Sequence, residues 1–141
     1  MTTTDAERCE TDCVHPAQVA AAWGRLAVAP APDRVAALFG ILGDPTRVKV
    51  LTALGDGELC VCDLAVATGV NRTTISHQLR VLRDHRLVRR RRDGKIVYYA
   101  LDDGHVRDVL TIGAAHVAEP AAPPLGVEDP ADHATAEATR R

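Results

Sequence analysis

The sequence contains few aromatic residues and no long apolar run. Its 141 residues include one Trp, one Phe and two Tyr, too few for a protein that stacks successive single-stranded bases on aromatic side chains. No apolar run approaches the roughly 20 residues of a membrane-spanning helix. The first 13 residues carry four acidic side chains and no apolar stretch, unlike a signal peptide. We therefore expect a cytoplasmic protein, in which the four cysteines are thiols or metal ligands rather than structural disulfides.

The formal net charge is only -2, from 17 basic and 19 acidic residues, but the charge is unevenly distributed. Residues 71–99 contain nine arginines and lysines and two aspartates, net +7, whereas residues 1–15 carry -3 and residues 100–141 carry -5. A concentrated basic block is typical of a surface that binds a polyanion, although a solvated charged face has the same composition. The sequence has no nucleophile–base set and no glycine-rich phosphate loop, so we do not expect an enzyme.

Apolar periodicity and capping residues predict six helices, and the dipeptide Asp93-Gly94 between two short runs predicts a β-hairpin. The second strand of the hairpin is expected over residues 95–101, and Asp33 and Asn71 are expected to cap the helices that they open. The predicted fold is mainly α with a small β-hairpin (α+β). The helices are expected over residues 16–28, 33–42, 46–54, 60–68, 71–85 and 103–118.

The order of the elements also predicts how the chain is organised. A short helix, a glycine turn and a longer polar helix form a helix-turn-helix, and the hairpin that follows supplies the wing of a winged helix-turn-helix. We expect residues 16–119 to form this DNA-binding domain. Residues 1–15 are expected to be a flexible leader that carries metal ligands. Residues 120–141, rich in Pro and Ala with scattered acids, are expected to be a disordered tail.

The helix predicted over residues 71–85 is the candidate recognition helix, whose N-terminal residues would meet base edges in the major groove of double-stranded DNA. Ile75, Leu79 and Leu82 mark its buried stripe. Arg pairs bidentately with guanine and Gln with adenine, whereas basic residues of the wing suit phosphate or minor-groove contacts. Simple solvent exposure is the alternative for each residue taken singly. The DNA-contact candidates are Arg72, Thr73, Thr74, Ser76, His77, Gln78 and Arg80 in the helix, and Arg90, Arg91, Arg92 and Lys95 in the wing.

Several short motifs together resemble the ArsR/SmtB family of metal-sensing winged-helix repressors. They are LGDPTR at residues 42–47, ELCVCDL at 58–64, ISHQL at 75–79, DGK at 93–95 and the paired tyrosines at 98–99. The resemblance covers roughly residues 33–119. It implies a homodimer that represses a metal-resistance or efflux operon by binding operator DNA, and that leaves the DNA when metal binds.

The first candidate metal site consists of the four cysteines, Cys9, Cys13, Cys60 and Cys62. Soft thiolates favour Cd(II), Pb(II) or Zn(II) over hard cations. Residues two apart on a helix point about 200° apart, so Cys60 and Cys62 share an ion only at an extended helix start. The alternatives are a small buried core thiol for that pair and unbound thiols in the leader. Within the family, the C-x3-C of the leader is similar to the CadC-like cadmium/lead sensors, in which the leader of one protomer is completed by the Cys pair of the other.

The second candidate metal site is on the last predicted helix and consists of Asp103, His105, His116 and Glu119. The two histidines share a helix face but are separated by roughly 16 Å along it, so one ion cannot bind both in one chain. Two such helices packed antiparallel would pair Asp103 and His105 of one with His116 and Glu119 of the other, giving a Zn(II) site. A solvated helix face is the alternative, but the spacing resembles the interfacial zinc site of the family.

Two other functions fit parts of the sequence. A repressor responsive to arsenite or antimonite would use Cys60, Cys62 and one leader cysteine as three thiolate ligands. A metal-buffering protein would also use the cysteines, but it would not need the +7 block and would bind DNA without sequence preference or not at all. A DNA-binding titration with each metal discriminates among these functions.

Overall fold

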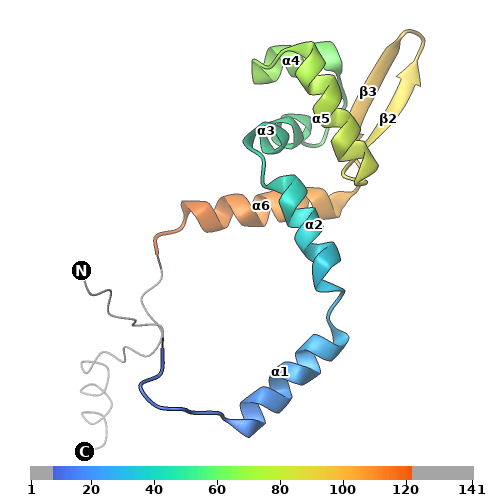
Figure 1. The fold of residues 1–141 in the computed structure, drawn as a ribbon. Coiled ribbons are helices and arrows are strands. Elements are labelled where there is room, and N and C mark those ends of the chain that lie inside the picture. The colour runs from blue at the N-terminus through green and yellow to red at the C-terminus, as the bar shows by residue number, and fades with distance from the viewer. Residues whose placement is uncertain (1–7, 122–141) are drawn as a thin grey trace, which may run out of the picture.

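The computed structural model describes residues 8–121 and has six helices and three strands in that range (Figure 1). No described helix is long and apolar enough to cross a membrane. Residues 1–7 of the predicted leader and residues 122–141 of the predicted tail lie outside the described range, and residues 8–15 form neither helix nor strand. The elements are α1 (Pro16–Val28), α2 (Pro32–Leu42), α3 (Pro45–Leu54), β1 (Leu59–Cys60), α4 (Val61–Thr68), α5 (Arg72–Asp84), β2 (Val88–Asp93), β3 (Ile96–Leu101) and α6 (Gly104–Ala118).

Side-chain caps begin three of the six described helices. The carboxylate of Asp44 accepts the backbone N–H of Arg47 at 3.0 Å, and the amide oxygen of Asn71 accepts that of Thr74 at 2.8 Å. The side chain of Asp103 likewise caps α6. The expected cap at Asp33 is wrong: α2 begins at Pro32, because the fixed φ of proline suits the first helical position, and Asp33 lies in the first turn.

The sheet is larger than the predicted hairpin. Its strand order is β1-β3-β2, and both pairings are antiparallel. The sequence did not predict β1, whose two residues are too few to show a period and pair with Tyr98 and Tyr99 of β3. The turn at Asp93-Gly94 is present, but the second strand begins at Ile96 rather than at residue 95, and Gly94 adopts a positive φ of 59°. The predicted mainly α fold with a small β component is otherwise confirmed.

The core packs the helix-turn-helix against the sheet. Ile75, Leu79 and Leu82 are fully buried, as their predicted stripe requires. They share one apolar cluster with side chains from α3, α4, the strands and α6. Helix α2 contributes partly buried residues to this cluster, whereas α1 buries none of its residues and leaves Trp23 67% exposed. In Figure 1, α1 lies away from the other helices.

Candidate nucleic-acid interface and thiol site

The turn between α4 and α5 sets the direction of α5, the candidate recognition helix. Gly69 ends α4 in the left-handed conformation at φ 70°, which glycine adopts without steric cost, and Asn71 then caps α5. With the apolar stripe of α5 buried, its polar candidates are mostly exposed. Those exposed are Arg72, Thr73, Ser76, His77 and Arg80, whereas Thr74 and Gln78 are half-buried.

The Gln78 side chain is engaged inside the protein. The Arg47 Nε donates a hydrogen bond to Gln78 Oε1 at 2.8 Å, and Arg47 Nη1 donates to the carbonyl oxygen of Ile41 at 3.2 Å. A bidentate contact with adenine needs both the amide oxygen and the amide nitrogen of a glutamine. Arg47 already donates to that oxygen, which leaves the amide nitrogen as the hydrogen-bond donor, and the contact of Gln78 with DNA stays a prediction. The sequence indicates Arg47 only as part of the LGDPTR motif, because its partner Gln78 is 31 residues away.

The four consecutive arginines of β2 do not form one basic surface. Side chains alternate between the faces of a sheet, so Arg90 and Arg92 share one face, and Arg89 and Arg91 share the other. Arg91 Nη2 donates to Glu58 Oε2 at 2.6 Å, and the guanidinium carbon of Arg91 lies 4.9 Å from the centre of the Tyr98 ring.

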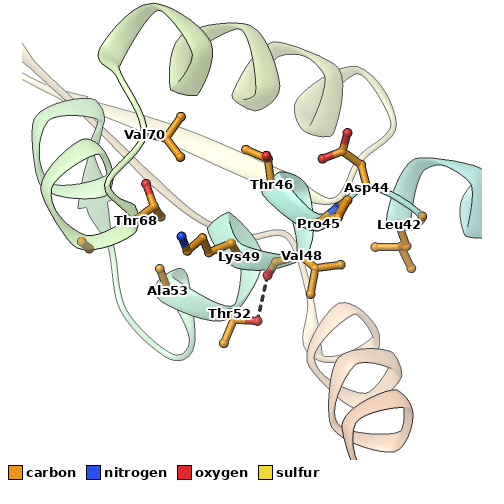
Figure 2. Close-up of a pocket in the computed structure, with 12 residues that line it drawn as sticks. Leu42, Asp44, Pro45, Thr46, Val48, Lys49, Thr52, Ala53, Thr68 and Val70 are labelled. Atoms are coloured by element: carbon orange, nitrogen blue, oxygen red, sulfur yellow. Dashed lines mark hydrogen bonds between the residues drawn. The ribbon is translucent and has the colours of Figure 1, made fainter. Parts of the chain in front are cut away.

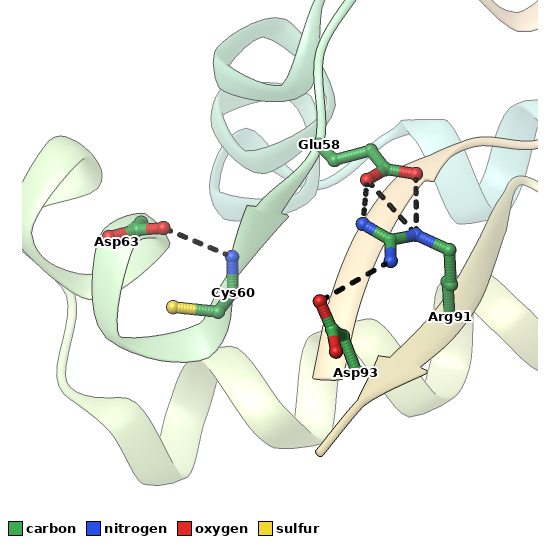
Figure 3. Close-up of polar contacts among 5 residues, drawn as sticks. All are labelled: Glu58, Cys60, Asp63, Arg91 and Asp93. Atoms are coloured by element: carbon green, nitrogen blue, oxygen red, sulfur yellow. Dashed lines mark hydrogen bonds and ion pairs between the residues drawn. The ribbon is translucent and has the colours of Figure 1, made fainter. Parts of the chain in front are cut away.

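Figure 3 shows the Arg91 guanidinium between the carboxylates of Glu58 and Asp93. The hydrogen bond from Arg91 lowers the pKa of Glu58, and the same bond raises the pKa of Arg91. The Arg91 guanidinium is thus already paired with carboxylates, and its contact with DNA stays a prediction. The sequence could not signal this, since Glu58 lies 33 residues earlier.

The Cys60–Cys62 pair lies where β1 becomes α4. Cys60 has an extended conformation (φ -84°, ψ 172°) and is the N-cap of α4, so the helix begins one residue later. This is the extended start at which two thiols spaced by one residue can approach the same ion. The backbone N–H of Cys60 donates to Asp63 Oδ2 at 3.3 Å, as Figure 3 shows. Cys60 is half-buried and Cys62 is exposed, so neither is a buried core thiol.

The leader thiols lie together but apart from the Cys60–Cys62 pair. A hydrogen bond between the Cys9 and Cys13 side chains raises the pKa of Cys13, and both residues are exposed. Within residues 8–121, no three His, Cys, Asp or Glu side chains are close enough to hold a metal ion together. One chain therefore does not bring the four cysteines into a single site.

The α6 candidates occupy the two ends of that helix. Asp103 Oδ1 caps the helix, and its Oδ2 lies 3.2 Å from His105 Nδ1, an interaction that lowers the pKa of Asp103. His116 is in the last turn and Glu119 is the C-cap. All four residues are exposed. Within one chain the structure joins Asp103 to His105 and leaves the other two at the far end.

A wide cavity of about 880 Å³ lies between α3 and the end of α4 (Figure 2). Apolar residues such as Val48, Ala53 and Val70 line it, together with Lys49 and three threonines, and no Cys or His does. The cavity therefore contains none of the candidate metal ligands.

Comparisons with known proteins match the DNA-binding region and most of the chain. A family model described as bacterial regulatory protein, arsR family, matches residues 44–90. A transcriptional repressor SmtB homolog from Synechocystis is 41% identical over 111 residues, which are 79% of this chain and 84% of that protein. A cadmium resistance transcriptional regulatory protein CadC homolog from Staphylococcus aureus is 40% identical over 80% of this chain and 93% of its own length.

A solved structure shares the fold. The homodimeric winged helix-turn-helix DNA-binding domain Mb0332 from Mycobacterium bovis, a possible ArsR-family regulator, superimposes with a TM-score of 0.57. It is 33% identical in sequence, and the match covers 60% of this chain and 79% of that domain. The winged helix-turn-helix predicted from the order of elements is thereby confirmed.

Proposed function

This chain belongs to the ArsR family of bacterial regulatory proteins, and on that premise we propose that it is a metal-responsive transcriptional repressor acting in the cytoplasm. It binds operator DNA as a homodimer through α5 and the β2–β3 wing. A thiophilic divalent ion, Cd(II), Pb(II) or Zn(II), releases it and turns on genes for metal efflux or resistance. The family consists of transcriptional regulators, so the chain is not an enzyme.

The position of Cys60 carries this proposal. Cys60 is the N-cap of α4, the first helix of the helix-turn-helix, and its strand β1 pairs with β3 of the wing through Tyr98. One residue thus begins the helix-turn-helix and bonds to the wing. An ion that pulls Cys60 and Cys62 toward external ligands therefore acts at once on the helix-turn-helix, through α4, and on the wing, through β3.

The ligand set needs two protomers. The Cys60–Cys62 pair of one protomer and the Cys9–Cys13 pair of the other supply four thiolates, which suit Cd(II), Pb(II) or Zn(II). This assignment agrees with the exposure of three of these cysteines and with the lack of any three-ligand group within residues 8–121 of one chain.

A second pair of sites, suited to Zn(II), would form between two α6 helices packed antiparallel in the dimer. Asp103 and His105 of one helix would meet His116 and Glu119 of the other, and nitrogen and oxygen ligands of this kind suit Zn(II). Their exposure at opposite ends of α6 agrees with this arrangement.

In the proposed mechanism, the metal-free dimer holds its two recognition helices at the spacing of adjacent major grooves. Metal favours a dimer geometry in which the helices fit the grooves poorly. In typical allosteric proteins the coupling free energy between two ligands is about 1–3 kcal/mol. This coupling is reciprocal, so DNA must weaken metal binding by the same factor by which metal weakens DNA binding.

The test is a DNA-binding titration by fluorescence anisotropy. The metal-free protein first selects a duplex from a library of randomised inverted repeats. Release from that duplex is then measured with Cd(II), Pb(II), Zn(II) and arsenite on the wild type, Cys60→Ser and His116→Ala. We expect Cys60→Ser to bind DNA normally without metal and to resist release by Cd(II), whereas His116→Ala is still released.

Two results would reject the proposal or redirect it. If none of the ions changes the affinity of the wild type, the protein is no metal sensor. If Cd(II) releases Cys60→Ser as it does the wild type, the thiolate site is not the sensor. If arsenite releases the protein from DNA, and still does so after one leader cysteine is replaced by serine, the result indicates the alternative sensor with three thiolate ligands.

A further inference from the structure

A polar cavity of about 330 Å³ lies between α5 and the wing. Its α5 residues Ser76, Arg80 and Arg83 are spaced by four and three, which places them on one helix face. Arg90 of β2 is the register partner of Tyr99 of β3, so the two side chains lie on the same face of the sheet. The complete lining is Ser76, His77, Arg80, Arg83, Arg90 and Tyr99.

The lining combines three guanidinium groups with no carboxylate. Within residues 8–121, Arg80, Arg83 and Arg90 form no ion pair, in contrast to Arg91, which is bound to Glu58 on the opposite face of the sheet. Three like charges around one cavity repel each other unless an anion occupies it. The hydroxyls of Ser76 and Tyr99 add neutral hydrogen-bond donors.

We propose that this cavity is a phosphate site and that, in the complex with DNA, it holds one phosphate of the duplex backbone. The proposal rests on the proposed function and adds Arg83 and Tyr99 to the DNA-contacting residues. Guanidinium groups match the geometry of phosphate oxygens and bind them in pairs of hydrogen bonds. Phosphate is therefore the anion for which the three arginines and two hydroxyls are best suited.

The position of the cavity along α5 favours the DNA backbone over a base. A helix rises 1.5 Å per residue, so Arg83 lies roughly 16 Å along the axis from Arg72 at its start. The major groove is about 12 Å wide, and the first residues of a recognition helix are those that meet base edges. The far half of α5, together with the wing, therefore lies over the phosphates that border the groove.

A contact with a phosphate positions the protein without reading sequence. Loss of Arg83 should therefore weaken binding to every duplex by a similar factor. It should also make the dependence of the affinity on salt shallower, because each phosphate contact releases about 0.9 counterion from duplex DNA.

The test compares Arg83→Gln with Arg86→Gln on the full chain. Both variants remove one positive charge, but Arg86 is exposed and does not line the cavity. Affinity for a random-sequence duplex is measured by anisotropy from about 50 to 200 mM KCl. We expect Arg83→Gln to bind about tenfold more weakly and to lower the slope of log affinity against log salt by about one. Arg86→Gln should retain the wild-type slope.

Tyr99→Phe keeps the ring that packs against the core and removes the hydroxyl, so it tests the cavity without the loss of a charge. We expect a few-fold weaker binding with an unchanged slope. If Arg83→Gln and Arg86→Gln have equal slopes, or if Tyr99→Phe binds as the wild type does, the cavity is not a phosphate site.

A second series replaces chloride by inorganic phosphate at equal ionic strength and thereby separates the two sources of phosphate. If phosphate and chloride weaken the wild type equally while Arg83→Gln has the shallower slope, the ligand is the duplex backbone, as proposed. If phosphate weakens the wild type more than chloride and Arg83→Gln does not show this difference, the cavity also takes free phosphate. If phosphate weakens DNA binding by the wild type more than chloride does, but Arg83→Gln keeps the wild-type slope of log affinity against log salt, the assignment of the cavity to a DNA phosphate is rejected.

The proposed function fails by a different result. A wild type that binds all duplexes alike and ignores metal is no metal-responsive repressor, yet the slope comparison still applies to it. A wild type that binds no duplex overturns both proposals.

Discussion

Arg47 and Gln78 join α3 to the recognition helix through a single side-chain hydrogen bond of 2.8 Å, from the guanidinium Nε to the amide oxygen. Because arginine only donates hydrogen bonds, it fixes which way the Gln78 amide faces. The oxygen points to Arg47, which leaves the amide nitrogen as the donor for the contact with DNA that we predict. Arg47 also bonds the carbonyl of Ile41 at the end of α2, so it ties three helices together.

Removal of the Arg47 guanidinium should destabilise the fold. In Arg47→Met both of its side-chain hydrogen bonds are lost while the aliphatic part of the side chain is kept. At about 1 kcal/mol for each bond, we expect the free energy of unfolding to fall by about 2 kcal/mol in urea denaturation. Arg34→Met, an exposed change on α2, is the control and should have little effect.

The donor role of Gln78 is tested by Gln78→Glu. The carboxylate still accepts from Arg47, but it donates nothing to a base and repels phosphate. We expect unchanged or higher stability together with at least about tenfold weaker binding to the selected duplex. Gln18→Glu on α1 makes the same charge change outside the interface and should bind normally. Equal affinities of the two variants would place Gln78 outside the DNA contact.

Because the side chains of β2 alternate between the two faces of the sheet, the adjacent residues Arg90 and Arg91 have different surroundings. Arg90 lines the cavity beside α5, whereas Arg91 is paired with Glu58. The substitutions Arg90→Gln and Arg91→Gln remove the same charge, and each serves as the control for the other. We expect Arg90→Gln to lower the salt slope by about one and Arg91→Gln to lower it less. Equal slopes would show that the Glu58 pairing does not survive on DNA.

The bond from Arg91 lowers the pKa of Glu58, so this pair has a definite pH dependence. A carboxylate with a depressed pKa in the folded state stabilises the fold above its unfolded pKa, and this contribution is lost as the pH falls through the folded pKa. We expect Arg91→Gln to return the pKa of Glu58 toward its ordinary value in a carboxyl-carbon NMR titration. An unchanged pKa would mean that the pair does not form in solution.

The placement of the thiolate site between protomers can be tested by mixing two inactive variants. One variant carries Cys9→Ser and Cys13→Ser, and the other carries Cys60→Ser and Cys62→Ser. If each site combines the leader of one protomer with the Cys pair of the other, their heterodimer regains one of two sites. We expect neither parent to bind Cd(II) tightly and the mixture to recover tight binding, measured by calorimetry. Sites formed within one protomer would give no recovery.

Local signals in the sequence determined nearly all of the elements. Prolines, capping side chains and glycines act within a few residues, so the bounds of α1, α3, α5 and α6 follow the sequence closely. The sequence also predicted the buried stripe of α5 and the hairpin turn at Asp93-Gly94. The candidate ligands were identified by residue type and spacing, together with the family resemblance.

Contacts between distant segments were decided by the tertiary structure alone. The strand β1 exists because it pairs with β3, and two residues have no period of their own. Four consecutive arginines look alike in the sequence, and only the pairing of β2 with β3 decides which of them face α5 and which face Glu58, since a shift of one residue exchanges the two faces. The partners of Gln78 and Arg91 lie 31 and 33 residues away, beyond the reach of any local pattern.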